Sequence, residues 1–288
     1  MKRRTAIIFF IVFLIIIILL VVLLYSYYQF TLRQDSYDLD KTISIANWNL
    51  QIFGDKKAND SMLMNSYAEK VSKYDIVFLQ EIRDKDSSSF FALCNMLPDH
   101  DCQISGRAGR SSSKEQYGVV YLKKFNSNII DYNPDGLDRW ERPPLRVDFS
   151  YKNYSFTVYN IHTKPDNVSI EMKNLESLIN SENNQGNLVV LGDLNADCYY
   201  YNPYSLSDFN GWKWIIGNDQ DTTSGNSDCA YDRIIMNNNA YNEFIRVGID
   251  SENIDTKISD HYLIWMLIRD HDYQKDKTFK AYLSSVFS

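Results

Sequence analysis

Short, continuously apolar segments recur along this chain and limit the folds that it can adopt. Residues 76–79 (Ile-Val-Phe-Leu) and 188–191 (Leu-Val-Val-Leu) are apolar at every position. Strands of this kind are buried on both faces, as in a sheet that other layers cover on each side. Amphipathic stretches typical of helices lie between the apolar segments, at 59–73, 87–97 and about 169–181. The pattern predicts an α/β domain with covered sheets.

The expected strands follow one another without internal repeats, low-complexity segments or a domain boundary. They lie at residues 42–48, 75–80, 118–123, 145–151, 155–161, 188–191, 231–236 and 262–268. We therefore expect one domain over residues 42–270, which is an ordinary size for an α/β unit. The stretch 271–288 is charged and then weakly amphipathic, and we expect a tail or a short docking helix there.

The N-terminus carries a different signal. An unbroken apolar run from Ala6 to Tyr25 follows Lys2, Arg3 and Arg4. A helix of about 20 apolar residues crosses a hydrocarbon core of ~30 Å, and basic residues favour the cytoplasmic side. Residues 1–30 therefore predict a cytoplasmic flank and a single transmembrane anchor, and residues 31–41 a polar tether. The domain over residues 42–270 is then extracytoplasmic.

A cleavable signal peptide is the alternative for the N-terminus. Its apolar region is shorter, roughly 7–15 residues, and it ends at a small-residue cleavage site. Here the apolar run ends in a Tyr- and Phe-containing segment, 25–30, that suits a membrane interface. The sequence favours the uncleaved anchor over secretion after signal cleavage.

Charge and cysteine content narrow the function further. The formal net charge of −7 excludes a protein that holds nucleic acid through charge alone, but not an enzyme whose carboxylates bind a metal ion. The four cysteines, an even number, permit disulfides outside the cytoplasm, and none has the spacing of a zinc site. These cysteines are Cys94, Cys102, Cys198 and Cys229.

Polar residues suited to metal binding and acid–base chemistry follow or precede the apolar strands. Ligand sites of open α/β sheets lie at such strand ends. One carboxylate there is usually a turn former or a cap, but six such points in one chain indicate a catalytic site. The six are Asn49, Gln80-Glu81, His162, the segment Asp193-Leu-Asn195-Ala-Asp197, Asp232, and Asp260-His261. His100 and His271 lack this context, and we expect both at the surface. Trp212 and Trp214 flank an apolar strand and are expected in the core.

This ordered set resembles the endonuclease/exonuclease/phosphatase superfamily. Four stretches are similar to deoxyribonuclease I within it: 80–84 (Gln-Glu-Ile-Arg-Asp), 109–117, 192–198 and 228–234. The resemblance covers about residues 42–269. It implies a four-layer α/β sandwich, in which helices flank two packed mixed β-sheets, here preceded by the single transmembrane helix.

The resemblance implies a role for each matched polar residue. Oxygen ligands around a Mg²⁺ or Mn²⁺ ion would come from Asn49, Glu81, Asp193, Asn195 and Asp260. His162, paired with Glu115, would protonate the leaving 3′ oxygen. His261, paired with Asp232, would orient or deprotonate the attacking water, since a carboxylate partner fixes the imidazole tautomer and raises its pKa.

Further residues follow from the same resemblance. Arg83 and Arg142 would contact backbone phosphate, with Arg110 and Lys114 as additional candidates. A disulfide would join Cys198 and Cys229, and the pairing of Cys94 with Cys102 stays open. Asp221 and Thr223 resemble a structural Ca²⁺ loop, although Gly225 leaves it without a side-chain ligand. Ser113 stands where the family has a tyrosine that packs into the DNA minor groove.

The sequence thus predicts a membrane-anchored, divalent-metal-dependent endodeoxyribonuclease, monomeric and of little sequence specificity, that leaves 5′-phosphate ends on DNA. The alternative on the same fold is a phosphodiesterase or phosphatase acting on lipid or inositol phosphates, which the anchor favours. A repair nuclease for apurinic sites fits worse, because an external domain does not meet the chromosome. A degenerate binding module would lack a metal or acid–base residue, and none is missing.

Overall fold

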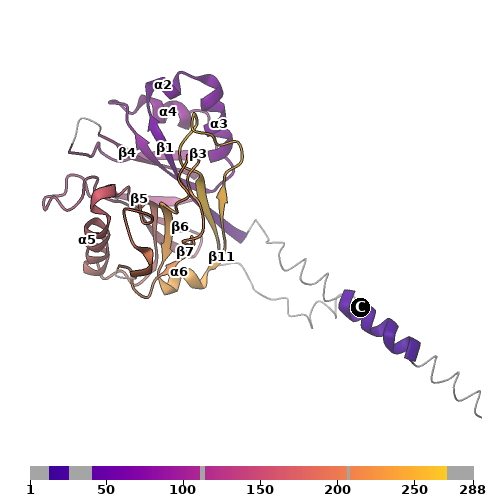
Figure 1. The fold of residues 1–288 in the computed structure, drawn as a ribbon. Helices are drawn as coiled ribbons and strands as arrows, with labels where there is room; N and C mark the ends of the chain where they lie inside the picture. Colours follow the sequence, from indigo (N-terminus) through magenta and orange to yellow (C-terminus); the bar gives the residue numbers. More distant parts are fainter. Residues whose placement is uncertain (1–12, 26–40, 111–113, 206–207, 271–288) are drawn as a thin grey trace, which may run out of the picture. The chain divides into compact units, whose positions relative to one another are not determined.

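The computed structural model describes residues 13–25, 41–110, 114–205 and 208–270 of the chain (Figure 1). The larger of its two compact units covers residues 43–271. This unit holds every strand of the described chain.

Two six-stranded sheets form the centre of the larger unit. The first has the order β11-β12-β1-β2-β4-β3 and the second the order β5-β6-β7-β8-β10-β9. Parallel pairs, β1 with β2 and β7 with β8, stand beside antiparallel pairs such as β2 with β4 and β10 with β8, so both sheets are mixed. The strands of the first sheet are β1 (Thr42–Phe53), β2 (Ile76–Ile82), β3 (His100–Ile104), β4 (Gln116–Leu122), β11 (Phe244–Asp250) and β12 (Leu263–Arg269). Those of the second are β5 (Asn126–Asp131), β6 (Leu145–Tyr151), β7 (Tyr154–Asn160), β8 (Asn187–Asp193), β9 (Lys213–Trp214) and β10 (Asp232–Met236).

The continuous apolar segments are buried on both faces, as the sequence predicts. In β1, Ile43 and Ile45 enter a cluster that holds residues of both sheets, whereas Ala46 and Trp48 enter a cluster on the outer face. Successive side chains of a strand point to opposite faces, so one apolar strand supplies two cores at once.

Helices cover the outer face of each sheet. Tyr67 of α3 and Phe90 of α4 pack in the same cluster as Trp48, and Met172 of α5 packs in the outer cluster of the second sheet with Val190. The helices are α2 (Asp55–Ala58), α3 (Ser61–Val71), α4 (Ser88–Cys94), α5 (Val168–Ser181) and α6 (Asn238–Asn242), with 3₁₀ turns η2 (Pro165–Asn167) and η3 (Pro203–Ser205). The layers are helix, sheet, sheet and helix, which confirms the expected four-layer sandwich.

Both disulfides form between residues of the described chain. Cys198 is bonded to Cys229, as the resemblance implied, and Cys94 to Cys102, the pairing that the sequence left open. The second bond ties the end of α4 to β3. His100, expected at the surface, lies in the edge strand β3 opposite Leu122 and is partly exposed. His271 lies outside the described residues. Trp212 and Trp214 are partly buried against the outer cluster of the second sheet.

The N-terminal apolar run is described only in part. Residues 13–25 are helical, and their large apolar side chains are exposed. Across the described portion of the chain, no helix is both long enough and apolar enough to cross a membrane. Residues 1–12 and 26–30 of the expected flank and anchor, residues 31–40 of the tether and the tail 271–288 lie outside the described residues.

Candidate active site

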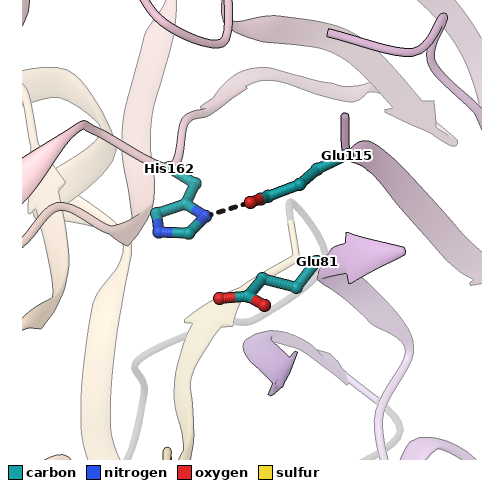
Figure 2. A group of neighbouring side chains, drawn as sticks. All are labelled: Glu81, Glu115 and His162. Atoms are coloured by element: carbon teal, nitrogen blue, oxygen red, sulfur yellow. Dashed lines mark hydrogen bonds and ion pairs between the residues drawn. The ribbon is translucent and has the colours of Figure 1, made fainter. Parts of the chain in front are cut away.

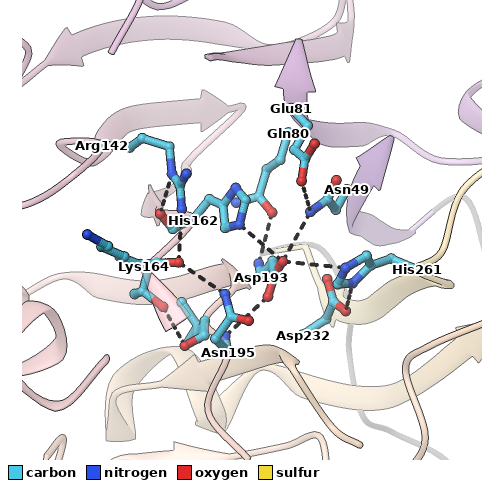
Figure 3. A network of polar contacts seen from close by, with 12 residues as sticks. Asn49, Gln80, Glu81, Arg142, His162, Lys164, Asp193, Asn195, Asp232 and His261 are labelled. Atoms are coloured by element: carbon cyan, nitrogen blue, oxygen red, sulfur yellow. Dashed lines mark hydrogen bonds and ion pairs between the residues drawn. The ribbon is translucent and has the colours of Figure 1, made fainter. Parts of the chain in front are cut away.

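The predicted site residues gather where the strands of both sheets end (Figure 3). Because β1 and β2 are parallel, Asn49 lies opposite Gln80, one residue before Glu81. In the second sheet, Asp193 ends β8 and lies opposite Asp232, the first residue of β10. His162 follows β7 and His261 precedes β12.

A polar contact between the sheets fixes the floor of the site. The side-chain amide of Gln80 accepts a hydrogen bond from the Asp193 backbone (2.9 Å) and donates one to the Ile161 carbonyl (2.9 Å). A Cβ on Gly192, at φ +147°, would lie 2.0 Å from the same carbonyl oxygen. Since only glycine fits this approach, it sets the position of the neighbouring Asp193.

Glu115 and His162 form the first acid–base pair (Figure 2). Glu115 Oε2 lies 2.9 Å from His162 Nδ1, and its other oxygen accepts from Arg83 (3.0 Å) and Arg142 (3.1 Å). Burial alone would raise the pKa of Glu115, but His162 and the two guanidinium groups outweigh it and hold that pKa at about 2. Glu115 is therefore ionised and fixes the orientation of the His162 ring.

Asp232 and His261 form the second pair. Asp232 Oδ2 lies 2.7 Å from His261 Nδ1, and the carboxylate is completely buried. Burial works against a charged imidazole, yet the carboxylates of Asp232 and Asp193 raise the pKa of His261 to about 10. In both pairs the carboxylate and the histidine come from opposite sheets: Glu115 precedes β4 and His162 follows β7, while Asp232 begins β10 and His261 precedes β12.

The two imidazole rings converge on one buried oxygen (Figure 3). Asp193 Oδ2 lies 3.3 Å from His162 Nε2, 3.5 Å from His261 Nε2 and 3.1 Å from the Asn49 amide nitrogen. Burial opposes the charge on Asp193, but the two histidines outweigh it and lower its pKa. Two imidazole Nε2 atoms thus face one small volume from two sides.

The remaining predicted metal ligands line this volume. Asn49 donates to Glu81 Oε1 (3.3 Å), and Asn195 donates its backbone N–H to Asp193 Oδ1 (3.1 Å). Asp260 is at the rim, with its side chain 45% exposed and Oδ1 3.8 Å from His261 Nε2. The structure brings the five predicted ligands into one neighbourhood.

Two groups of acidic and histidine side chains have ligand atoms close enough together to hold a metal ion. One group is Glu81, Glu115 and His162, and the other is Asp193, Asp232 and His261. Within these groups the closest contacts are the carboxylate–imidazole bonds of the two pairs. Those bonds occupy Nδ1 of each ring and leave both Nε2 atoms directed at Asp193.

The four cationic side chains predicted to contact DNA differ in their exposure and in the protein groups that they already bind. Arg142 is only 12% exposed and donates to Glu115 and to the carbonyls of His162 (2.9 Å) and Thr163 (3.0 Å). Arg83 bridges Glu81 (2.8 Å) and Glu115 at the edge of the site. Arg110 pairs with Asp138 (3.0 Å), while Lys114 is exposed. Ser113 lies outside the described residues.

The segment compared with a calcium loop is held together by its own hydrogen bonds. Asp221 Oδ1 accepts from the Thr223 backbone (2.9 Å), the Thr223 hydroxyl (2.8 Å) and the Cys229 backbone (3.2 Å). Its neighbour Thr222 accepts from the Asp232 backbone (3.1 Å). The loop therefore supports the Asp232–His261 pair, and a calcium ion there stays a prediction.

Gln80, which the sequence marked together with Glu81, and two residues that it did not single out hold the site in place. Gln80 links the sheets, and the Tyr117 hydroxyl accepts from the His162 backbone (2.9 Å). Lys57 donates to the carbonyls of Leu50 (2.8 Å) and Ile258 (2.7 Å) and so joins the end of β1 to the segment before His261. Gln80 was marked by its place at the end of an apolar strand, whereas Tyr117 and Lys57 carry no such signal.

At one end of a four-layer sandwich, two carboxylate–imidazole pairs flank a buried aspartate, an arrangement of acid–base groups typical of a hydrolase centre. The model of the endonuclease/exonuclease/phosphatase family matches residues 46–261. Deoxyribonuclease-1-like 2 of Mus musculus is 33% identical in an alignment of 211 residues that covers 67% of this chain and 76% of that protein. Deoxyribonuclease-1 of Gallus gallus is 28% identical over 79% of this chain and 93% of its own length. The chain therefore belongs to the endonuclease/exonuclease/phosphatase family, in its deoxyribonuclease I branch, and is a hydrolase of the phosphodiesterase class.

Solved structures agree with the fold. A family protein from Bacteroides vulgatus superposes with a TM-score of 0.60 at 17% identity and covers 80% of this chain and 99% of its own. TDP2 of D. rerio, complexed with a single-strand DNA product, gives 0.57 at 16% identity, with 78% and 98% covered.

Proposed function

We propose that this protein is a divalent-metal-dependent endodeoxyribonuclease that hydrolyses DNA phosphodiester bonds with little sequence specificity and leaves 5′-phosphate ends. The relatives named deoxyribonuclease-1 support DNA as the substrate. The candidate cations Arg83 and Lys114 are proposed to bind backbone phosphate, and such contacts carry no sequence information.

One observation carries the proposal. The Nε2 atoms of His162 and His261 face the same oxygen of Asp193 at 3.3 and 3.5 Å, each ring fixed by its own carboxylate. An in-line displacement at phosphorus needs a proton acceptor on one side and a proton donor on the other, within hydrogen-bond reach of the reacting group. This arrangement supplies both.

The residues then divide the reaction between them. His261, oriented by Asp232, holds and deprotonates the attacking water at Nε2. His162, oriented by the ionised Glu115, donates the Nε2 proton to the leaving 3′ oxygen. Cleavage of the bond between phosphorus and the 3′ oxygen leaves a 3′-hydroxyl on one fragment and a 5′-phosphate on the other. Arg142 keeps Glu115 ionised and in place through its guanidinium group.

The donor set fits a hard divalent cation. Glu81, Asn49, Asp193, Asn195 and Asp260 offer carboxylate and amide oxygens at one end of the sandwich. Mg²⁺ and Mn²⁺ bind through one or two carboxylates and keep several waters, so this set suffices. A bound cation would neutralise phosphate charge and offset the two carboxylates that raise the pKa of His261.

Plasmid nicking by the full chain tests the proposal. Supercoiled DNA is expected to convert to the open circle with Mg²⁺ or Mn²⁺ and not with a chelator. His162→Ala should abolish conversion, whereas His100→Gln, at a histidine remote from the site, should not. DNA ligase should reseal the nicks directly if they carry a 5′-phosphate. Cleavage that persists in His162→Ala, or nicks that ligase cannot seal, would contradict the assigned chemistry.

We also propose that the N-terminal segment anchors the enzyme in a membrane, with the catalytic domain outside the cytoplasm. The apolar run Ala6–Tyr25, the basic residues before it and the two disulfides of the domain support this location. In cell fractions the full chain should stay with membranes after carbonate washing, and a chain lacking residues 1–30 should not. Release of a shortened chain into the medium would instead indicate a cleaved signal peptide.

A further inference from the structure

Glu171 is a buried carboxylate that takes no part in either acid–base pair. It lies in the first turn of α5 and is completely buried. Its Oε1 accepts from the Glu141 backbone (2.9 Å), and its Oε2 accepts from the Lys164 backbone (3.0 Å). Glu141 directly precedes Arg142, and Lys164 is the second residue after His162. One side chain therefore ties together the two segments that carry Arg142 and His162.

The Tyr117 hydroxyl forms a second bridge between the same two segments. It accepts from the His162 backbone (2.9 Å) and donates to the Arg142 carbonyl (3.3 Å). Arg142, His162 and Lys164 lie next to one another in the site (Figure 3). We call the Glu171 carboxylate and the Tyr117 hydroxyl together the brace, since each accepts from one segment while it contacts the other.

The brace supports both members of the first acid–base pair. His162 Nδ1 lies 2.9 Å from Glu115, and the other oxygen of Glu115 accepts from Arg142 (3.1 Å). One braced segment thus carries the imidazole, and the other carries a guanidinium group that holds its carboxylate. A shift between the segments would change the direction in which His162 Nε2 points, and small errors of this kind slow catalysis strongly.

A carboxylate at this position lowers stability unless its contacts serve a purpose. Burial raises the pKa of Glu171, and the two backbone N–H groups and Arg142 offset this effect only in part. An acid whose pKa is raised on folding destabilises the folded protein at pH values above its usual pKa. An apolar residue of similar size would avoid this loss, but it would leave both N–H groups without an acceptor. The two bridging contacts therefore account for the carboxylate.

We propose that Glu171 and the Tyr117 hydroxyl are positioning residues for the general acid, which keep the His162 Nε2 proton directed at the leaving 3′ oxygen. This rests on the proposed nuclease function and gives a role to two residues outside the acid–base pairs. The effect of losing the brace should then depend on how strongly the leaving group needs a proton. A sulfur leaving group departs as a thiolate, which is far less basic than an alkoxide and needs protonation less.

Two DNA duplexes that differ in one atom test this role. One has an ordinary linkage at a defined position, and the other has sulfur in place of the leaving 3′ oxygen there. Cleavage at that position by the full chain with Mn²⁺ is followed on denaturing gels. His162→Ala calibrates the assay, because loss of the general acid itself should slow the oxygen linkage far more than the sulfur linkage.

Glu171→Gln keeps the size of the side chain but turns one acceptor into an NH₂ group that faces a backbone N–H. We expect it to slow cleavage of the oxygen linkage by about tenfold, the equivalent of one lost hydrogen bond, and of the sulfur linkage by about twofold at most. Tyr117→Phe, which removes the other bridge, should show the same selectivity. It keeps the proposal testable if Glu171→Gln does not fold.

Glu182→Gln provides the matched control. Glu182 follows the last turn of α5, at the opposite end of the helix from Glu171, and its carboxylate also joins separate elements through Arg146 (3.0 Å) and the Tyr132 hydroxyl. It is remote from the catalytic residues. Its substitution should therefore leave the ratio of the two cleavage rates as it is in the parent.

Hydrogen exchange gives a second measurement that needs no cleavage. In Glu171→Gln the amide proton of Glu141, of Lys164 or of both should exchange about tenfold faster, while amides of β8 keep their protection. This change should be absent from Glu182→Gln.

The outcomes separate the brace from the proposed function. Equal losses at both linkages in the folded variants, no loss at either, or unchanged exchange at both amides overturns the positioning role even if the protein cleaves DNA. If the parent cleaves neither linkage, the nuclease proposal fails by itself. Faster exchange in Glu171→Gln then still supports the brace, and unchanged exchange overturns it.

Discussion

Replacing Glu115 by glutamine tests whether the first acid–base pair depends on a charge. Glutamine keeps the size of the side chain and removes the charge that faces His162, Arg83 and Arg142. The amide no longer stabilises an imidazolium, and it fixes the His162 ring in one tautomer only. We expect kcat for plasmid nicking to fall by about 10²- to 10⁴-fold, the range for a positioned acid–base group, with little change in KM.

The stability effect follows from the same contacts. Glu115 has a pKa of about 2 instead of its usual 4.5, which corresponds to about 3 kcal/mol in favour of the ionised, folded form at neutral pH. The substitution also leaves two guanidinium groups without their carboxylate. We therefore expect Glu115→Gln to lower the free energy of unfolding by about 3 kcal/mol in urea titrations at pH 7.

A control is needed because loss of stability by itself reduces activity. Glu182 forms an equivalent contact with Arg146 (3.0 Å) and also binds the Tyr132 and Tyr159 hydroxyls, but it is remote from the site. Glu182→Gln should be destabilised as well and should keep kcat. Normal kcat in folded Glu115→Gln, or an equal loss of kcat in Glu182→Gln, would refute the reasoning about the pair.

Four further predictions concern pH, packing, disulfides and metal. Because the pKa of Glu115 in the folded protein is below its usual value, its contribution to the free energy of unfolding is present above about pH 4.5 and disappears as the pH falls toward 2. The urea midpoints of the parent and Glu115→Gln should therefore converge over that pH range. A difference between the midpoints that stays constant with pH would contradict this prediction. Gly192→Ala should lower Tm and activity together, since its Cβ would lie 2.0 Å from the Ile161 carbonyl oxygen and displace Asp193; a neutral substitution would mean that the backbone can shift. Replacing Cys198 and Cys229 by serine should lower the free energy of unfolding by about 4 kcal/mol, because this disulfide closes a loop of 31 residues. Replacing Cys94 and Cys102 should lower it by about 2–3 kcal/mol, because that loop spans only 8 residues. Calorimetry should therefore show the larger fall in Tm for the first pair. Asp260→Asn should raise the Mg²⁺ concentration for half-maximal nicking while His100→Gln does not, and an unchanged Mg²⁺ titration would remove Asp260 from the ligand set.

The strands that the sequence predicts and those that it misses differ in their place in the sheets. Every strand of the described domain that the sequence failed to predict lies at a sheet edge: β3 and β11 in the first sheet, β5 and β9 in the second. The interior strand β8 is almost wholly buried, whereas β5 (Asn-Ser-Asn-Ile-Ile-Asp) is exposed or partly exposed throughout. Periodicity detects strands through burial, so an edge strand with polar residues gives little signal.

The site shows the same division between local pattern and tertiary contact. Asp193, Asn195 and His261 stand in short motifs, so sequence alone identified them. Arg142 contacts Glu115 and the carbonyls of His162 and Thr163, which only folding brings near it, and the local sequence predicted none of these contacts. The Cys94–Cys102 bond was equally inaccessible, since pairing depends on where α4 and β3 lie.

In each carboxylate–imidazole pair, one sheet supplies the carboxylate and the other sheet supplies the histidine. This division has a consequence for biosynthesis. Neither sheet contains a complete proton donor or acceptor, so a nascent or partly folded chain whose sheets have not yet packed together cannot cleave a phosphodiester. Catalysis begins only with the last long-range step of folding. The appearance of nicking activity during refolding should therefore follow the docking of the two sheets, and not the earlier formation of strands within each.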